Sequence, residues 1–200
     1  MLVKEAKFLY GVEHLSTLPS GSLPEIALVG RSNVGKSTLV NNLTKIKKLA
    51  RASATPGRTR QLNFFQVELA TTTKKKNSFF LVDLPGFGFS KLSHERREEL
   101  SEMIVNYILN RPTLKVICLL NDARRNAEKD ELAIRDLAYQ AGKHLIVLLT
   151  KADKLSKNEL NNAIKNSAAS YSLLPEDVVV CGEGIPVDTV WQRVLPLIEK

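Results

Sequence analysis

The chain contains few of the residues on which disulfide-rich and histidine-based metal proteins depend. Its 200 residues include only two cysteines and three histidines. Cys118 lies in the apolar run VICLL and Cys181 follows VVV, so both are expected to be reduced, packed side chains. His14, His94 and His144 lack the spacing of metal ligands and are expected to be structural or surface residues. A disulfide framework and a histidine metal centre are therefore not expected.

Long apolar runs are also missing. No stretch approaches the roughly 18 consecutive apolar residues that cross a bilayer. Residues 1–19 carry Glu5 and Glu13 and have no continuous apolar core, unlike a secretion signal. Neither a membrane span nor an export signal is expected, and the sequence predicts a cytoplasmic protein.

The charge is weighted to the basic side, with 29 Lys and Arg against 21 Asp and Glu and a net charge of +8. This excess favours a polyanionic partner, and a merely solvated basic surface is an equally open alternative. No aromatic residues interleave with the basic ones as on a single-strand stacking platform, so a nucleic acid would be contacted through phosphates and shape. The basic residues gather at Lys45, Lys47, Lys48, Arg51, Arg58 and Arg60, then at Lys74–Lys76, Arg96–Arg97 and Arg124–Arg125.

Apolar runs of strand length alternate with helical patterns along the chain. Strands are expected at residues 25–30, 62–69, 78–86, 115–122, 144–153 and 177–180, and helices at 37–46, 94–110, 127–142, 158–170 and 187–200. This order predicts an α/β fold in one domain over residues 25–200, with a mostly parallel six-stranded sheet, one antiparallel strand and helices on both faces. Residues 1–24 are expected to be an extension packed on that domain, and Trp191 is expected to anchor the core.

The segment GRSNVGKST, residues 30–38, follows an apolar run and precedes a helical pattern. Gly30-x4-Gly35-Lys36-Ser37 is the phosphate-binding loop pattern in the strand–loop–helix context that it requires. The glycines let successive N–H groups face phosphate oxygens, and the helix N-terminus adds its positive end. Lys36 is expected to reach the terminal phosphates and the Ser37 hydroxyl to bind Mg²⁺. The remaining loop residues expected to contact the nucleotide are Arg31, Ser32, Asn33, Val34 and Thr38.

The segment DLPG ends another apolar strand, about 45 residues after the lysine of the loop. Asp83 is placed to hold Mg²⁺ through water, and the Gly86 N–H to meet a γ-phosphate. Leu84 and Pro85 complete this expected contact segment. Alone such a pattern is weak and usually marks a turn, but its position after a buried strand makes it meaningful.

The segment TKAD, from Thr150 through Lys151 and Ala152 to Asp153, ends a further buried strand. The Asp153 carboxylate can accept hydrogen bonds from N1–H and N2–H₂ of guanine, whereas adenine would leave it unpaired. The Lys151 stem can cover the purine face. Thr150 stands where guanine-binding loops more often have Asn, so one tethering contact is expected to be shorter or missing. Together the motifs predict a preference for GTP over ATP.

In this order the motifs resemble the EngB (YihA/YsxC) family of bacterial TRAFAC-class GTPases. The resemblance covers nearly the whole chain and is carried by PEIALVGRSNVGKSTLVNNL, PGRTRQLNFF, DLPGFGFS and TKAD. It implies a Ras-like P-loop GTPase domain that binds GTP and GDP with Mg²⁺. It also implies a role in late assembly of the large ribosomal subunit and a requirement for normal cell division and septation.

The resemblance implies further site residues by position. Thr59 would be a second Mg²⁺ ligand in switch I and part of the catalytic set with Lys36 and Asn33, with Thr55 as a competing candidate. The family's last base-contacting stretch, usually a Ser pair, falls on Val180, Cys181 and Gly182, so contacts there are expected from the backbone. The other expected switch I contacts are Gly57, Arg58, Arg60, which replaces a common Gln, and Gln61.

The residue after Gly86 is Phe87, where Ras-like enzymes place a water-orienting Gln. Phenylalanine has no polar group for that role, so intrinsic hydrolysis is expected to be slow, and a partner surface or K⁺ must complete the site. Related GTPases use a loop Asn to bind K⁺, and two roles stay open for Asn33: K⁺ ligand or loop stabiliser.

Three functions are compatible with these features to different degrees. The favoured one is a monomeric GTP hydrolase that switches its docking on ribosomal RNA or the large ribosomal subunit. The alternative is a nucleotide-gated RNA- or ribosome-binding module with incidental turnover. A metabolic P-loop kinase is disfavoured by TKAD and by the lack of an evident lid or acceptor pocket.

Overall fold

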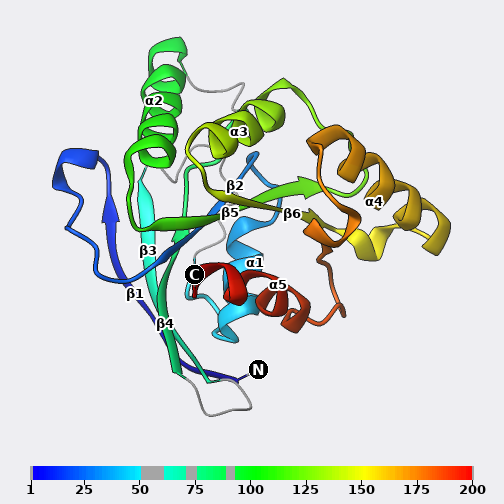
Figure 1. Ribbon diagram of the computed structural model, residues 1–200, viewed down its shortest axis with the longest axis horizontal. Coiled ribbons are helices and arrows are strands. Elements are labelled where there is room, and N and C mark those ends of the chain that lie inside the picture. The colour runs from blue at the N-terminus through cyan, green and yellow to red at the C-terminus, as the bar shows by residue number, and fades with distance from the viewer. Residues whose placement is uncertain (1, 51–60, 71–75, 89–92, 200) are drawn as a thin grey trace.

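The computed structural model describes residues 2–50, 61–70, 76–88 and 93–199, which fold around one seven-stranded sheet. The strand order is β1-β3-β4-β2-β5-β6-β7 (Figure 1). The strands are β1 (Leu2–Val12), β2 (Glu25–Gly30), β3 (Leu62–Ala70), β4 (Lys76–Asp83), β5 (Leu114–Asp122), β6 (His144–Thr150) and β7 (Val178–Val180). The α-helices are α1 (Lys36–Thr44), α2 (His94–Asn110), α3 (Lys129–Gln140), α4 (Lys157–Tyr171) and α5 (Asp188–Ile198).

The direction of the strands confirms the predicted fold class. β2 pairs in parallel with β4 and β5, and the parallel ladder continues through β6 to β7. β3 is antiparallel to both of its neighbours, β1 and β4, so among the described strands it alone runs in the opposite direction. Parallel strands covered by helices are expected to be apolar on both faces, and every residue of β2 is buried.

The predicted count of six strands is wrong, because residues of the expected extension form β1. This strand pairs along β3 from Leu2 opposite Ala70 to Val12 opposite Leu62, with two register irregularities. Its apolar signal is weak because an edge strand has little of its surface covered, and only Ala6 and Val12 are buried. The sequence pattern therefore did not distinguish it from a surface extension.

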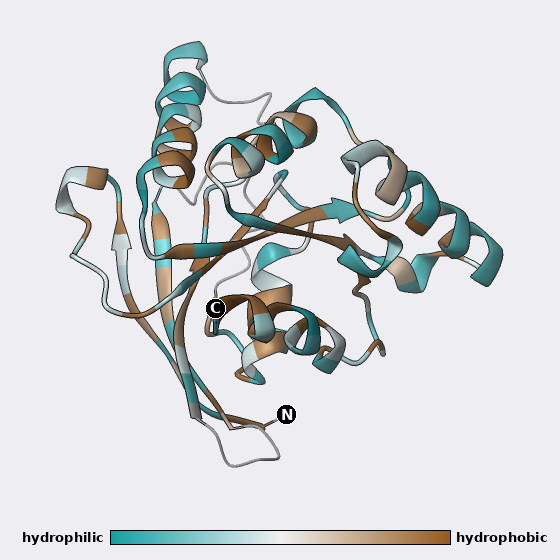
Figure 2. Cartoon of the chain, viewed as in Figure 1, coloured by the Kyte–Doolittle hydropathy of each residue, from teal (hydrophilic) through white to brown (hydrophobic). Residues whose placement is uncertain are grey.

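Helices cover both faces of the sheet, as Figures 1 and 2 show. The first apolar core lies under α1 and α5, and the second under α2, α3 and α4. Alternate residues of β2 supply the two cores, with Ile26 in the first and Ala27 in the second. Trp191 of α5 is 2% exposed, and its Nε1 donates to the Leu43 carbonyl oxygen of α1 at 3.3 Å, which confirms it as a core anchor.

Two further expectations are answered by the described residues. Cys118 and Cys181 are both buried and unpaired thiols. In the part of the chain with assigned structure, no helix has the length and apolar character to cross a membrane.

Candidate functional site

The three sequence motifs lie at one edge of the sheet, where β2, β4 and β6 end. Parallel pairing places Leu28 of β2 beside Asp83 of β4, and Asp122 of β5 beside Thr150 of β6. The carboxyl ends of parallel strands are the usual position for ligand sites in open α/β sheets. The topology thus assembles segments that are more than one hundred residues apart in the sequence.

The loop between β2 and α1 requires its two glycines. A Cβ on Gly30 would lie 2.8 Å from the Leu120 carbonyl oxygen, so no larger residue fits there. Gly35 precedes α1 with φ +109°, a conformation that other residues rarely adopt. Asn33 is exposed and also left-handed, with φ 61°. Lys36 reaches back across the loop, and its Nζ donates to the Gly30 carbonyl oxygen at 3.1 Å.

Asp83 and Lys36 form the electrostatic centre of the site. Burial raises the pKa of Asp83 from 3.8 to about 6, although the nearby Lys36 ammonium opposes this change. Burial likewise lowers the pKa of Lys36, and Asp83 partly restores it. The Asp83 Oδ1 atom is buried and has no hydrogen-bond partner among the described residues. A buried carboxylate oxygen of this kind is suited to a ligand that brings its own donor or positive charge.

The segment after β4 is hydrogen-bonded to the phosphate-loop motif. Ser32 N donates to the Phe87 carbonyl oxygen at 3.0 Å, and Phe87 N donates to the Gly30 carbonyl oxygen at 3.4 Å. A Cβ on Gly86 would lie 3.1 Å from Ser32 N and 3.2 Å from Lys36 Nζ, so this approach depends on glycine. The position predicted to meet a γ-phosphate is thus adjacent to the lysine predicted to hold it.

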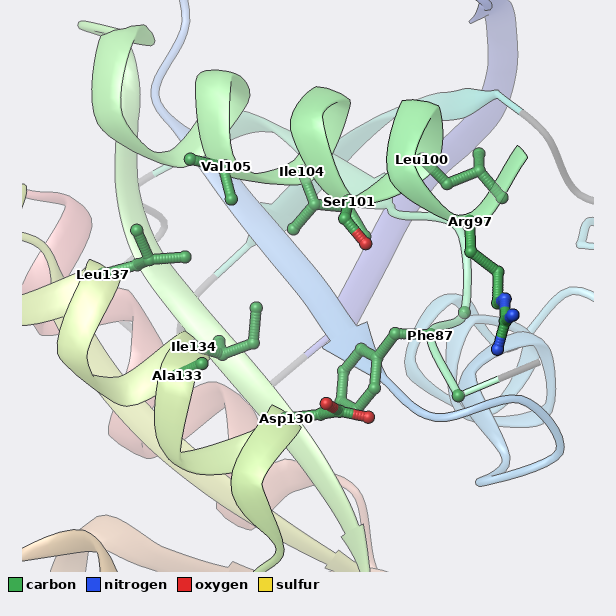
Figure 3. Close-up of a pocket in the computed structure, with 12 residues that line it drawn as sticks. Phe87, Arg97, Leu100, Ser101, Ile104, Val105, Asp130, Ala133, Ile134 and Leu137 are labelled. Carbon is green, nitrogen blue, oxygen red and sulfur yellow. The ribbon is translucent and has the colours of Figure 1, made fainter. Parts of the chain in front are cut away.

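The Phe87 side chain lies at a hollow between α2 and α3. Its ring lines this hollow, of about 470 Å³, together with Ile104 and Ile134 (Figure 3). The ring packs against the second apolar core and is partly buried. Phenylalanine has no polar side-chain atom, so Phe87 cannot orient a water molecule.

Thr150 connects the TKAD segment to the phosphate-loop motif. Its Oγ1 donates to the Val34 carbonyl oxygen at 2.8 Å and lies 3.2 Å from the Asn121 carbonyl oxygen. The threonine hydroxyl therefore makes a tether between the two segments, and the loss of one contact that an Asn would make stays a prediction. Buried polar contacts of this type fix the relative position of two loops.

Asp153 lies against the stretch that follows β7. Its Oδ1 accepts from Glu183 N at 3.1 Å, and Lys154 Nζ lies 2.9 Å from its Oδ2. The Lys154 ammonium, followed by the Glu183 amide, lowers the pKa of Asp153. A Cβ on Gly182 would lie 2.6 Å from the Asp153 Oδ1, and Ala152 N donates to the Cys181 carbonyl oxygen at 3.1 Å.

The predicted switch I residues are only partly within the described residues. Thr55, Gly57, Arg58, Thr59 and Arg60 lie outside them. Gln61 is described, and its Nε2 donates to the Asn63 Oδ1 at 3.0 Å. Gln61 also lies against Gly11 of β1, so its contacts face the edge strand.

Two acidic groups at the site, Asp122 and Glu128, were missed by the sequence motifs. Asp122, at the end of β5, pairs with Lys151 at 3.1 Å and with Arg124 at 2.7 Å. Arg31 of the loop donates from Nη1 to Glu128 Oε2 at 2.8 Å, just before α3. The position of Asp122 at the end of a buried parallel strand was a usable signal, because the same argument identified Asp83.

The described residues contain no group of three or more His, Cys, Asp or Glu side chains able to hold a metal ion. A divalent cation would therefore need oxygen ligands from a bound molecule or water in addition to the protein. The protein offers two oxygen donors for such a cation: the Ser37 hydroxyl at the start of α1 and the Asp83 Oδ1, which no described residue hydrogen-bonds. Hard oxygen donors of this type suit Mg²⁺.

Comparison with known proteins finds a matching family and relatives that cover most or all of this chain. Residues 25–151 match the family described as 50S ribosome-binding GTPase. The "Probable GTP-binding protein EngB" of Lactobacillus acidophilus is 39% identical over 180 residues, covering 90% of this chain and 88% of that protein. Its namesake in Desulfatibacillum aliphaticivorans is 40% identical over 207 residues, covering 100% of this chain and 94% of that protein.

Solved structures share the fold at lower identity. A crystal structure of a "probable GTP-binding protein engB" matches with a TM-score of 0.67 at 24% identity, over 88% of this chain and 98% of that one. Aquifex aeolicus Era bound to GDP and AlF4⁻ matches with a TM-score of 0.73 at 23% identity, over 88% of this chain and 57% of that one.

Proposed function

The chain belongs to the EngB family of GTP-binding proteins, and from that premise we propose that it is a Mg²⁺-dependent GTPase that switches its binding to the ribosome. The observation that carries the proposal is the Thr150 hydroxyl on the Val34 carbonyl oxygen at 2.8 Å. This contact joins the segment suited to guanine to the segment suited to phosphates. One nucleotide can therefore engage both.

The phosphate tail is assigned to the loop between β2 and α1. Its N–H groups and the N-terminus of α1 attract the β- and γ-phosphates, and Lys36 exchanges its contact with the Gly30 carbonyl oxygen for phosphate oxygens. Gly86 lies close enough to Lys36 to offer its N–H to the γ-phosphate. The full assigned contact set is residues 30–38, 57–61, 83–86, 150–153 and 180–182.

The base is assigned to Asp153, with Val180, Cys181 and Gly182 beside it. The Asp153 carboxylate can pair with the guanine N1–H and N2–H₂. Adenine offers no such donors and has an acceptor at N1, so its binding would desolvate the carboxylate without adding a hydrogen bond. The apolar stem of Lys151 covers one face of the purine.

Magnesium is assigned to Ser37 and Thr59, with Asp83 acting through water. The fit is supported by the buried Asp83 oxygen, which no described residue hydrogen-bonds, and by the raised pKa of about 6 of this carboxyl, which a neighbouring cation would lower. When bound, Mg²⁺ neutralises charge on the β- and γ-phosphates. Asp83 would then stay ionised at a lower pH than it does without the cation.

Hydrolysis transfers the γ-phosphoryl group to water and releases GDP and phosphate. The chain contributes positioning and charge stabilisation through Lys36, the loop N–H groups and Gly86. Phe87 turns its ring into the hollow between α2 and α3 and cannot orient the attacking water (Figure 3). We therefore infer that the intrinsic rate is slow and that a partner or K⁺ completes the site.

Asn33 is the residue through which K⁺ would act. Its exposed side chain on the loop supports a role as a K⁺ ligand near the phosphates, and its left-handed backbone supports the simpler role of stabilising the loop. Single-turnover hydrolysis in KCl and in NaCl separates the two roles. Equal rates in both salts, for the native protein and for Asn33→Ala, would eliminate the K⁺ role.

Ribosome docking is assigned to the basic surface around switch I. The net charge of +8 and the exposed Lys45, Lys47 and Lys48 after α1 support contact with RNA phosphates. The matching family is described as ribosome-binding, and a structure of Era, similar at TM-score 0.69 and 22% identity, contains nucleotides 1506–1542 of 16S ribosomal RNA. From the family we also assign a role in large-subunit assembly, a requirement for cell division and septation, a cytoplasmic location and a monomeric state.

The decisive experiment on the nucleotide is calorimetric titration with GDP, GTP and ATP, each with and without Mg²⁺. Preference for guanine nucleotides, strengthened by Mg²⁺ and lost in Lys36→Ala, is the expected result. Equal affinity for ATP would refute the proposal. Ribosome pelleting with a GTP analogue and with GDP then tests the switch, and identical co-sedimentation would refute it.

A second function is favoured by Phe87. A nucleotide-gated binding module needs no efficient turnover, and this side chain supplies no group for it. The two functions differ in the response to the partner. A switch-type hydrolase accelerates by orders of magnitude on the ribosome, whereas a binding module keeps its basal rate.

A further inference from the structure

Asp122 is a buried carboxylate at the candidate site that belongs to none of the sequence motifs. It ends β5 and is 7% exposed. Its Oδ1 accepts from Arg124 Nε at 2.9 Å and from the Arg124 backbone N at 3.1 Å. Its Oδ2 accepts from Arg124 Nη2 at 2.7 Å and lies 3.1 Å from Lys151 Nζ. These donors, Arg124 first, hold the pKa of Asp122 well below its usual range, so the carboxylate is ionised at neutral pH.

Lys151 is held at both its backbone and its ammonium group. The backbone has φ 57°, a left-handed conformation that is uncommon for lysine. On one side Thr150 is bound to the Val34 carbonyl oxygen, and on the other Ala152 N donates to the Cys181 carbonyl oxygen. The ammonium ends on Asp122, so the four-carbon stem spans between two fixed points. A free lysine side chain would lose considerable rotamer entropy on being ordered.

We propose that Asp122 is a positioning residue for the nucleotide base, which it serves by fixing Lys151 with its stem along the face of the bound purine. The inference rests on the proposed function, since it takes a guanine nucleotide as the ligand of the TKAD segment. Arg124 has a supporting part: it orients both oxygens of Asp122 and offsets its charge. Lys151 is thereby ordered before the base arrives, and the ordering entropy is not lost on binding.

The proposed role differs from that of Asp153 in what it recognises. Asp153 reads hydrogen-bond donors on the edge of guanine, so its contribution depends on the base. Asp122 acts through an apolar stem on the face of the ring, and every purine has such a face. Inosine diphosphate lacks the 2-amino group of GDP. Loss of Asp122 should therefore weaken the binding of GDP and of inosine diphosphate by the same factor.

The test is a double-mutant cycle with Asp122→Asn and Lys151→Met, measured by calorimetric titration with GDP and with inosine diphosphate in the presence of Mg²⁺. Methionine keeps an apolar stem but lacks the charge that Asp122 holds. Each single variant is expected to bind both nucleotides about three- to ten-fold more weakly, the range associated with ordering one long side chain. The double variant is expected to bind no more weakly than Lys151→Met, because the two residues act as one unit.

The control is Asp136→Asn, which makes the same chemical change in an exposed ion pair with Arg135 on α3. It should leave both affinities unchanged. A purely structural role of Asp122 would weaken binding equally in the Lys151→Met background, and that additivity would overturn the proposal. If Asp122→Asn fails to fold, unchanged GDP affinity of Lys151→Met alone would overturn it.

Failure of this inference is distinguishable from failure of the proposed function. If the native protein binds no guanine nucleotide, both are refuted. If the native protein binds GDP and Asp122→Asn binds it equally well, only the role of Asp122 is refuted.

Discussion

Replacing Asp83 with asparagine is expected to stabilise the nucleotide-free protein at neutral pH and to weaken its Mg²⁺-dependent binding of nucleotide. The reason is that Asp83 is buried, and one of its oxygens has no hydrogen-bond partner in the part of the chain that the structure describes. Ionising such a group in the folded state is unfavourable, and the Lys36 ammonium offsets this only in part. Asparagine has nearly the same shape and carries no charge at any pH.

The magnitude follows from the pKa of Asp83, which the fold raises from 3.8 to about 6. Between these two values the folded state binds the proton more tightly than the unfolded chain, so the free energy of unfolding falls as the pH rises. One pKa unit corresponds to about 1.4 kcal/mol, which makes the full loss about 3 kcal/mol. The loss is nearly absent below about pH 3 and nearly complete above about pH 7. About 2 kcal/mol of it falls between pH 4.5 and 7.5.

The assay is urea unfolding of both proteins without nucleotide, followed by the fluorescence of the single, buried Trp191. The stability advantage of Asp83→Asn over the native protein should grow by about 2 kcal/mol from pH 4.5 to 7.5. In a second measurement at pH 7.5, GDP with Mg²⁺ should raise the melting temperature of the variant less than that of the native protein. With EDTA in place of Mg²⁺ the two shifts should be similar.

The reasoning is refuted if the stability difference between the two proteins is the same at both pH values. Such a result would mean that Asp83 does not bind its proton unusually tightly in the fold. Asp136→Asn serves as the control for the substitution itself, because Asp136 is exposed on α3. Its effect should be small.

Three further outcomes are expected. Thr150→Val removes the hydroxyl that reaches the Val34 carbonyl oxygen at 2.8 Å, and should lower the free energy of unfolding by about 1–3 kcal/mol in urea titrations and weaken GDP binding in calorimetry. Gly182→Ala puts a methyl group 2.6 Å from the Asp153 Oδ1 and 2.9 Å from the Asp153 backbone N, and should reduce GDP affinity in calorimetry together with the free energy of unfolding. Cys118 is buried and burial raises its pKa, so mass spectrometry should show no alkylation by iodoacetamide at pH 8 in the folded protein and full alkylation in urea.

Each of these outcomes has a contrary result. Unchanged stability of Thr150→Val would mean that the tether contributes nothing, and Thr189→Val, which removes an exposed hydroxyl bond to Pro186, is its control. Full GDP affinity of Gly182→Ala would place the base away from Asp153. Rapid alkylation of Cys118 without urea would mean that the sheet opens readily around β5.

Much of the fold was predictable because its strands are continuous apolar runs between turn signals. The helix expected at residues 94–110 is α2 (His94–Asn110), with Ser93 at its N-cap accepting from Arg96 N. The predicted ends of some helices and strands were wrong where one residue with a left-handed backbone ends the element. β6 was expected to run to residue 153 but ends at Thr150, because Lys151 is left-handed. Similarly, α1 stops at Thr44, and Lys45 after it has φ 58°.

The site was predictable where one local pattern carries the chemistry, and not where it depends on distant partners. The glycines and the lysine of residues 30–37 form a local pattern that by itself predicts phosphate binding, and the DLPG segment likewise follows a buried strand in a recognisable pattern. By contrast, the proposed role of Asp122 depends on its contact with Lys151, which lies 29 residues later in the chain and beside Asp122 in the structure. The Thr150 tether also depends on a carbonyl oxygen, which no side-chain pattern reveals.

The edge strand β1 determines how the protein can be trimmed for experiments. A truncated form limited to residues 25–151, the part that matches the GTPase family, would lack β1 on one side of the sheet and β7 with α4 and α5 on the other. The edge of β3 that faces β1 would then be open, and the N–H and C=O groups that alternate residues of this strand direct toward β1 would be unpaired in solvent, which is a template for aggregation. Forms shortened in this way are therefore expected to aggregate before their nucleotide binding can be measured, so the assays should use all 200 residues.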